Sequence, residues 1–173
     1  LSAHEGLEAV LRGEADFGIN MLSGQSAEID FTPLVEEPFV LACRRDHPFS
    51  GRKTLPWSEL VGHPLIGVSK SSGNRAVLDR ALAATGLQLE LNWFYEVNHL
   101  STSLGLVEAG LGISVLPKLA TPQHEHPLIA TVELENPVVS RTIGIVERRG
   151  APLSPAASRF RDLLLNEWRN SDL

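Results

Sequence analysis

Two hydroxyl-rich segments offer the clearest chemistry in this sequence, and each stands where an apolar run gives way to a helical pattern. The first is Ser69-Lys70-Ser71-Ser72-Gly73-Asn74, which follows the apolar run Leu65 to Val68. The free N–H groups and the dipole at a helix N-terminus favour an anion, and small hydroxyl side chains add donors without blocking its approach. We therefore expect Ser69 and Ser71 to contact a ligand; the alternative is that one serine simply caps the helix.

The second segment is Asn98-His99-Leu100-Ser101-Thr102, which follows the extended run Leu91 to Val97. It repeats the order of strand, polar turn and helix, so its side chains are expected at the same edge of a sheet as those of the first segment. Asn98, Ser101 and Thr102 are the candidate contacts here. Plain helix capping is again the alternative.

A third candidate lies near the N-terminus, where the short apolar strand expected over Asp16 to Asn20 ends. Asn20, Met21 and Leu22 follow that strand end and could line the opposite wall of a ligand pocket. The alternative is that these residues only begin a surface loop.

Residues that could support catalysis occur in unsuitable surroundings. Cys43 ends the apolar run Phe39 to Cys43, where a buried, neutral thiol is expected. Glu36 and Glu37 are adjacent along an extended segment, so their carboxylates point to opposite faces and cannot share acid/base work. The sequence also has no Gly-x-Ser-x-Gly elbow of a serine hydrolase. We therefore expect a binding protein and not an enzyme.

Metal and cofactor signals are equally weak. The histidines of His124-Glu125-His126 lie in a proline-flanked loop without a Cys or a third His at ligand spacing, so a structural role is expected. Gly110 and Gly112 come between a helix and a strand, which is the reverse of the order that holds a dinucleotide pyrophosphate. They are expected to form a helix C-cap and a turn. The sequence predicts no metal and no cofactor.

Apolar periodicity and turn residues predict alternating helices and strands around these segments. Helices are expected to begin at a Ser2/Glu5 capping box, at Leu55-Pro56, at each hydroxyl-rich segment and at Ser154-Pro155. Phe160, Leu163 and Leu164 are expected to form the buried face of the last helix. Strands are expected at Asp16–Asn20, Ile29–Val35, Pro38–Arg44, Leu65–Val68, Leu91–Val97, Ile113–Leu116, Leu128–Leu134 and Val138–Val146.

This alternation predicts an α/β fold with largely parallel strands and helices on both sides. The strands are too numerous for one small sheet. Two sheets, linked by extended runs near Pro38 to Arg44 and Arg141 to Glu147, accommodate them better.

Composition and charge set further bounds. The formal charge of −6 and the scattering of basic pairs such as Arg44-Arg45 disfavour DNA binding by this chain itself. No apolar stretch approaches the ~20 residues that span a bilayer. The N-terminus lacks the pattern of a secretion signal, and one cysteine suits a reducing compartment, so a cytoplasmic protein is expected.

Four segments, in a fixed order, resemble the effector-binding domain of LysR-type transcriptional regulators. They are Gly6–Ile19, Leu34–Ala42 followed by Asp46-His47-Pro48, Leu55–Leu60 running into Pro64-Leu65-Ile66, and Leu106–Pro117. The last of these, which contains Gly110-Leu111-Gly112, is the most specific.

The resemblance implies two Rossmann-like lobes joined by crossing strands, as in type 2 periplasmic solute-binding proteins, with a small polar or anionic effector held between them. Lobe I would comprise residues 1–40 and 142–173 and would lack its first strand and helix; lobe II would comprise 41–141. DNA would be bound only through a winged helix-turn-helix that this chain does not contain. The full-length protein is expected to be a homo-oligomer, whose dimer the missing first helix helps to form. A solute receptor of a transport system with the same architecture is the alternative.

Overall fold

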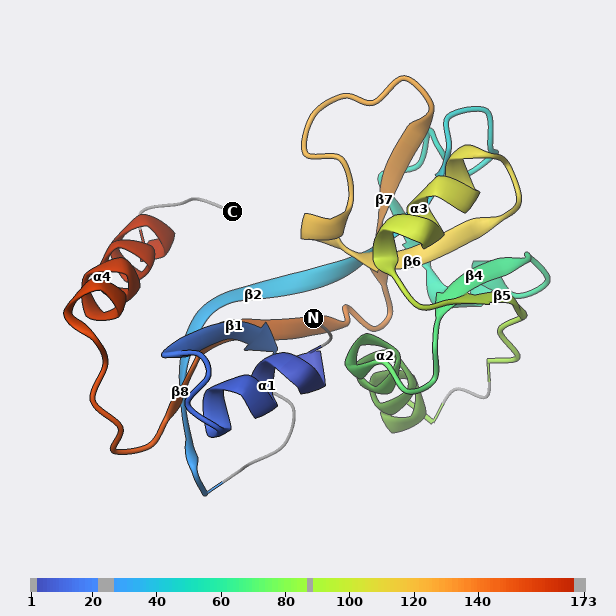
Figure 1. The fold of residues 1–173 in the computed structure, drawn as a ribbon. Coiled ribbons are helices and arrows are strands. Elements are labelled where there is room, and N and C mark those ends of the chain that lie inside the picture. The colour runs from blue at the N-terminus through green and yellow to red at the C-terminus, as the bar shows by residue number, and fades with distance from the viewer. Residues whose placement is uncertain (1–2, 22–26, 87–88, 170–173) are drawn as a thin grey trace. The chain divides into compact units, whose positions relative to one another are not determined.

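The computed structural model describes residues 3–21, 27–86 and 89–169 (Figure 1). The chain divides into two compact units, one made of Leu1–Glu36 and Thr142–Leu173, the other of Glu37–Arg141. No helix in the described part of the chain is both long enough and apolar enough to cross a membrane.

The first unit is built around an antiparallel strand pair. Helix α1 (Ala3–Leu11) packs against strand β1 (Phe17–Met21), and β1 pairs with β8 (Ser140–Arg148) over the register Phe17↔Glu147 to Met21↔Ile143. The helix, its end before Gly13 and the strand after it were all predicted. Ser2, one half of the expected capping box, lies outside the described residues.

Helix α4 (Pro155–Arg169) completes the first unit and corrects one prediction. Its start is as expected, because the Ser154 hydroxyl oxygen accepts a hydrogen bond from the Ala157 N–H at 3.2 Å. Its expected buried face is largely exposed, however: Phe160 and Leu163 are each 54% exposed, and Leu164 is half-buried. Periodicity predicts which residues share a helix face, but it does not supply a surface to cover that face.

Strand β2 (Ile29–Arg44) is one continuous strand of 16 residues, where two separate strands were expected. Its second half is held on both sides, by β6 (Ile113–Pro117) and by β7 (Ile129–Glu135), in antiparallel register. These pairings begin at Phe39, and the strand itself runs without a break through Pro38. The chain passes from one unit to the other within β2 and again within β8.

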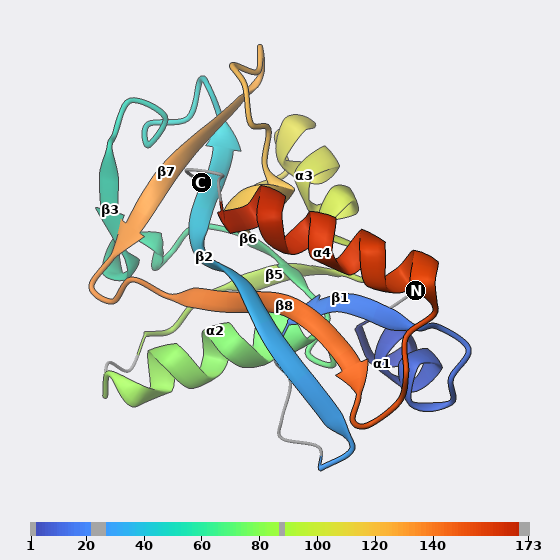
Figure 2. The same cartoon turned by 90° about the vertical axis from the view of Figure 1, so that its left-hand side faces the viewer.

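The sheet of the second unit is mixed. Strand β4 (Leu65–Val68) pairs in parallel with β5 (Trp93–Val97) and with β6, and a short strand, β3 (Thr54–Pro56), pairs in parallel with β7 (Figure 2). The expectation of largely parallel strands is right for β4, β5 and β6. It is wrong for β2, whose pairings with β6 and β7 are both antiparallel.

Helices α2 (Gly73–Ala84) and α3 (Leu100–Glu108) follow β4 and β5, as predicted, and both pack against β4. The expected helix at Leu55 is shorter: it is a 3-10 turn, η1 (Trp57–Leu60), preceded by Pro56 in β3. A second such turn, η2 (Lys118–Ala120), follows β6. The core of the unit is apolar and contains Phe39, Leu41, Cys43, Leu55, Trp57, Leu60, Leu65, Leu78, Ile113, Val115, Val132 and Leu134. This packing fixes the sheet edge from which the hydroxyl-rich segments emerge.

Candidate functional site

The two hydroxyl-rich segments meet at one edge of the second unit. Strands β4 and β5 are parallel neighbours with Val68 opposite Val97, so both segments leave the sheet at its carboxyl edge (Figure 1). The Ser69 N–H donates to the Val97 carbonyl oxygen at 2.8 Å, which fastens the first segment to the start of the second. The carboxyl edge of parallel strands is the usual position of ligand sites in α/β folds.

In the first segment the hydroxyl groups bond to one another and not to the helix. The Oγ atoms of Ser69 and Ser71 are 3.0 Å apart, and the Ser71 N–H donates to Ser69 Oγ at 3.4 Å. The N-cap residue of α2 is Ser72, whose side chain makes no capping bond. Ser69 is half-buried and Ser71 is exposed, so their hydroxyl groups are open to solvent and to a ligand.

In the second segment the candidate side chains are exposed. Asn98, Ser101 and Thr102 all face solvent, and the N-cap residue of α3 is His99, which makes no side-chain capping bond. Both helices of this edge thus begin without an N-cap side chain bonded to their first turn. Such N–H groups are available to an oxygen-rich ligand.

Sequence reasoning missed a buried serine pair directly beneath this edge. Ser103 and Ser114 are fully buried, with their Oγ atoms 2.7 Å apart, and Ser114 Oγ donates to the Ile66 carbonyl oxygen at 2.7 Å. These bonds link α3 to β6 and β4. The available signal was the four-residue spacing from Ser103 to Val107, which places both on the buried face of α3.

The remaining candidates belong to the first unit. Asn20 and Met21 end β1; the Met21 N–H donates to Asn20 Oδ1 at 2.8 Å, and the Met21 side chain is buried. Leu22 lies outside the described residues. The structure therefore brings together the candidates of the second unit, and places Asn20 and Met21 at a strand end of the other unit.

A buried ion pair was also missed. Glu37 is 2% exposed and lies 2.7 Å, Oε2 to Nη2, from Arg141, whose Nη1 donates to Asn74 Oδ1 at 2.6 Å. Glu36 is exposed, so the expectation that the two adjacent carboxylates face apart is confirmed. The sequence did contain a signal for this pair, because a carboxylate such as Glu37 on the buried face of an apolar strand requires a partner.

A second buried guanidinium holds α2 to the sheet. Arg75 stacks over the Trp93 ring at 4.1 Å from its centroid, and its Nε donates to Asp79 Oδ1 at 2.8 Å. The Arg75 Nη1 atom is buried and has no hydrogen-bond partner. A Cβ added at Gly67 would come within 2.5 Å of the Trp93 ring, so the glycine makes room for this stack.

The rejected catalytic and metal signals have structural roles. Cys43 is fully buried, and burial raises the pKa of its thiol to about 11, as expected for an inert thiol. His126 Nδ1 accepts the Ile129 N–H at 3.1 Å, and Glu125 pairs with Arg45 at 3.3 Å. Among the described residues no group of three or more His, Cys, Asp or Glu side chains is arranged to hold a metal ion.

The glycines of Gly110-Leu111-Gly112 form a helix end, as predicted. Gly110 has φ +79° and its N–H donates to the Val107 carbonyl oxygen at 2.9 Å, which ends α3. A Cβ at Gly112 would lie 2.5 Å from the Pro64 carbonyl oxygen. The positive φ at Gly110 and the close packing at Gly112, and not phosphate binding, require these two glycines.

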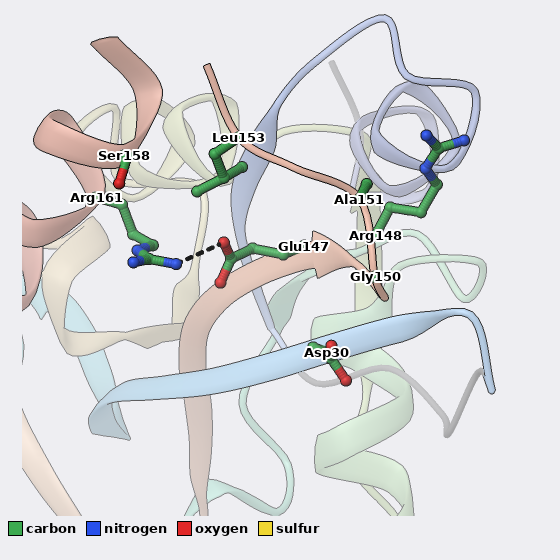
Figure 3. Close-up of a pocket in the computed structure, with 8 residues that line it drawn as sticks. All are labelled: Asp30, Glu147, Arg148, Gly150, Ala151, Leu153, Ser158 and Arg161. Carbon is green, nitrogen blue, oxygen red and sulfur yellow. Dashed lines mark hydrogen bonds and ion pairs between the residues drawn. The ribbon is translucent and has the colours of Figure 1, made fainter. Parts of the chain in front are cut away.

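Two cavities lie away from the hydroxyl-rich edge. One of about 540 Å³ is at the C-terminal end of α3, beside Arg44, Asp46 and Leu111. The other, of about 360 Å³, is in the first unit, where Arg161 points at Glu147 and bonds to it at 3.1 Å (Figure 3). Of the arginines that line these cavities, Arg44 and Arg161 are paired with carboxylates, whereas Arg148 of the second cavity belongs to none of the ion pairs described.

A family model described as the LysR substrate binding domain matches residues 1–169. The chain belongs to this family. It is 57% identical over 162 residues to the uncharacterized HTH-type transcriptional regulator YbhD of Escherichia coli K12, covering 94% of the chain and 50% of that protein. It is 31% identical over 165 residues to the E. coli DNA-binding transcriptional dual regulator OxyR, covering 92% and 51%. The chain thus spans about half the length of the curated relatives it matches.

Solved structures agree with this family. The reduced form of OxyR superposes on this LysR domain with a TM-score of 0.75 at 29% identity, covering 99% of the chain and 79% of OxyR. The Synechocystis CcmR regulatory domain in complex with 2-PG gives a TM-score of 0.84 at 20% identity over 98% of the chain and 81% of CcmR, which shows a common fold. The family and the α/β, periplasmic-binding-protein-like fold predicted from the sequence are confirmed.

Proposed function

We propose that this LysR domain is the effector sensor of a transcriptional regulator, and that it binds a small polar or anionic molecule at the hydroxyl-rich edge. The observation that carries the proposal is the meeting of Ser69–Asn74 and Asn98–Thr102 at the carboxyl ends of two adjacent parallel strands. Ser69, Ser71, Asn98, Ser101 and Thr102 supply the contacts.

The wider protein follows from the relatives, which are named as transcriptional regulators and are about twice as long. We propose that the two units are the two lobes, and that effector binding changes the geometry of a cytoplasmic homo-oligomer. DNA contact then comes from a winged helix-turn-helix outside these residues, since a charge of −6 opposes phosphate binding.

Binding without turnover is the expected activity. The hydroxyl groups of Ser69 and Ser71 bond to each other, and among the described residues neither bonds to a histidine or carboxylate that could act as a base. Several relatives are named as hydrogen peroxide-inducible genes activators, which raises thiol oxidation as an input. These 173 residues contain one cysteine, so no disulfide can form among them. We therefore assign ligand binding, and not thiol chemistry, as the signal.

Titration calorimetry of the chain against carboxylates, amino acids and aromatic acids tests the proposal. Loss of one hydrogen bond to a charged ligand weakens binding roughly tenfold, so Ser69→Ala and Ser101→Ala should each raise Kd by about that factor. Ser58→Ala, at an exposed serine of η1, should leave Kd unchanged. If none of these ligands binds more tightly than about 1 mM, or if both edge variants bind like the parent, the site is misassigned.

The transport-receptor alternative makes a different prediction. A receptor would come from a polypeptide with a secretion signal, whereas a regulator would carry a helix-turn-helix. Electrophoretic mobility shift of the full-length protein on promoter DNA, with and without the ligand found by calorimetry, separates the two. A bound ligand that leaves every DNA complex unchanged would favour the receptor. Mass spectrometry of the same ligand after incubation tests for turnover.

A further inference from the structure

The buried ion pair lies at both places where the chain changes unit. Glu37 is the first residue of the second unit, on β2, and Arg141 is its last, on β8. Their side chains are 1% and 13% exposed, and Arg141 Nε donates to Glu37 Oε2 at 2.8 Å. One contact thus joins two strand segments that are 104 residues apart in the chain.

Two more bonds extend this pair to the candidate binding edge. The Leu119 N–H donates to Glu37 Oε1 at 2.6 Å, which fixes the carboxylate from η2. On the other side, Arg141 Nη1 donates to Asn74 Oδ1 at 2.6 Å. Asn74 ends the segment Ser69–Asn74 and is the second residue of α2. A single guanidinium therefore links the first turn of α2 to β2 and β8.

The form of this network suggests a role beyond stability. A buried ion pair is often no more stabilising than apolar residues of the same size, because both charges lose their hydration. A guanidinium, however, holds several oxygen acceptors in a fixed plane. Opening the bond to Asn74 leaves the ion pair closed, so the α2 turn can shift without leaving a lone charge buried.

We propose that Arg141 is a positioning residue, which fixes the first turn of α2 through Asn74. A movement of that turn is transmitted through Arg141 to the peptide links Glu36–Glu37 and Arg141–Thr142, where the chain changes unit. The inference rests on the proposed function in taking the α2 turn as a ligand contact. It connects ligand binding at the α2 turn to the two points where the chain leaves the second unit.

Amide hydrogen exchange and chemical shifts of the 15N-labelled chain test this without a ligand. Asn74→Ala should speed exchange of the Phe39 amide, which bonds to the Val139 carbonyl beside the pair, by roughly fivefold. Asn74→Asp keeps an oxygen acceptor and should restore the parent rate. Asn92→Ala removes an exposed side chain ahead of β5 and should change nothing near Phe39.

A second experiment tests whether loss of the ion pair alters the α2 turn. Arg141→Met combined with Glu37→Met removes both charges and avoids a lone buried ion, so the chain should still fold. In this double variant the Ser69 and Ser71 amide resonances should move in the same direction as in Asn74→Ala. If Asn74→Ala perturbs only α2, or if the double variant keeps the parent shifts at Ser69 and Ser71, the positioning role is wrong. Neither result depends on ligand affinity, so the binding proposal stands or falls separately.

Discussion

The two units differ in how much apolar surface they bury. The second unit, a continuous segment, contains both hydrophobic clusters of the described residues, with Trp57, Leu41 and Leu65 fully buried. In the described part of the first unit, the buried apolar side chains are Val10, Met21, Ile145 and Val146. Phe160 and Leu163 of the same unit remain half exposed. The comparison indicates that the second unit is the rigid frame, and the hydroxyl-rich edge is built on it.

Truncating one aromatic residue in each unit gives the largest expected contrast. In the parent chain the Trp57 Nε1–H donates to the Pro137 carbonyl oxygen at 2.9 Å. Trp57→Ala leaves a large cavity in the second unit and removes the donor to this carbonyl. It should lower the free energy of unfolding by about 4 kcal/mol. Phe160→Ala, which loses a half-exposed ring against Phe17, should cost less than about 1 kcal/mol. Urea unfolding of both variants measures this, and equal losses would refute the contrast between the units.

The ion pairs should divide in the same way. Arg141→Met leaves the Glu37 carboxylate buried and should destabilise the chain by about 3 kcal/mol. Arg149→Met breaks a pair with Asp30 in which both side chains are more than half exposed, and should cost about 0–1 kcal/mol. Chemical denaturation at low and high salt checks both, since only the exposed pair should respond to screening.

Glycine substitutions test how closely each unit is packed. Gly67→Ala forces a methyl group against Trp93 and should cost about 2 kcal/mol. Gly6→Ala, in α1 with no atom within 4 Å of the added Cβ, should stabilise by roughly 0.5–1 kcal/mol. The matched control is Gly105→Ala in α3, which also has open space and should stabilise although it lies in the second unit. The midpoint of thermal unfolding of each variant shows whether the substitution stabilises or destabilises the chain.

The smallest expected effect is a pH dependence in the second unit. Burial, aided by the nearby His63, lowers the pKa of His47 below its usual value of 6.5. The folded state therefore binds this proton less readily than the unfolded state, so the stabilisation is fully present above pH 6.5 and is lost as the pH falls through the folded pKa. His47→Gln should flatten this part of the stability curve. An unchanged slope between pH 7.5 and pH 5, roughly the range over which histidine titrates, would contradict it.

The sequence predicted the features that depend on neighbouring residues. The ends of α1 and α3, the strands β4 and β6, and the hydroxyl turn at Ser69 all follow from local signals such as glycine, proline and apolar spacing. Because these signals recur in the order of the LysR effector-binding domain, the fold followed as well. The sequence alone therefore predicted the carboxyl edge of β4 and β5 as a candidate site.

The features that the sequence did not reveal depend on distant partners. The pairing of Glu37 with Arg141 joins residues 104 positions apart, and no local pattern connects them. Strand β2 runs without a break through Pro38, and its second half is paired from Phe39 to Arg44 with β6 and β7, which are distant in the chain. In the same way, the exposure of Phe160 reflects what packs against α4 and not the periodicity of α4 itself.

The buried thiol of Cys43 provides a built-in reporter of the second unit. Cys43 lies in the centre of the sheet on β2, opposite Ala130 of β7, and is fully buried. With a pKa near 11 it carries almost no thiolate at neutral pH. Because the thiol is also buried, an alkylating reagent can react with it only after the sheet has opened locally. Its labelling rate then measures how often the frame opens, in a chain that needs no engineered probe and offers no competing cysteine.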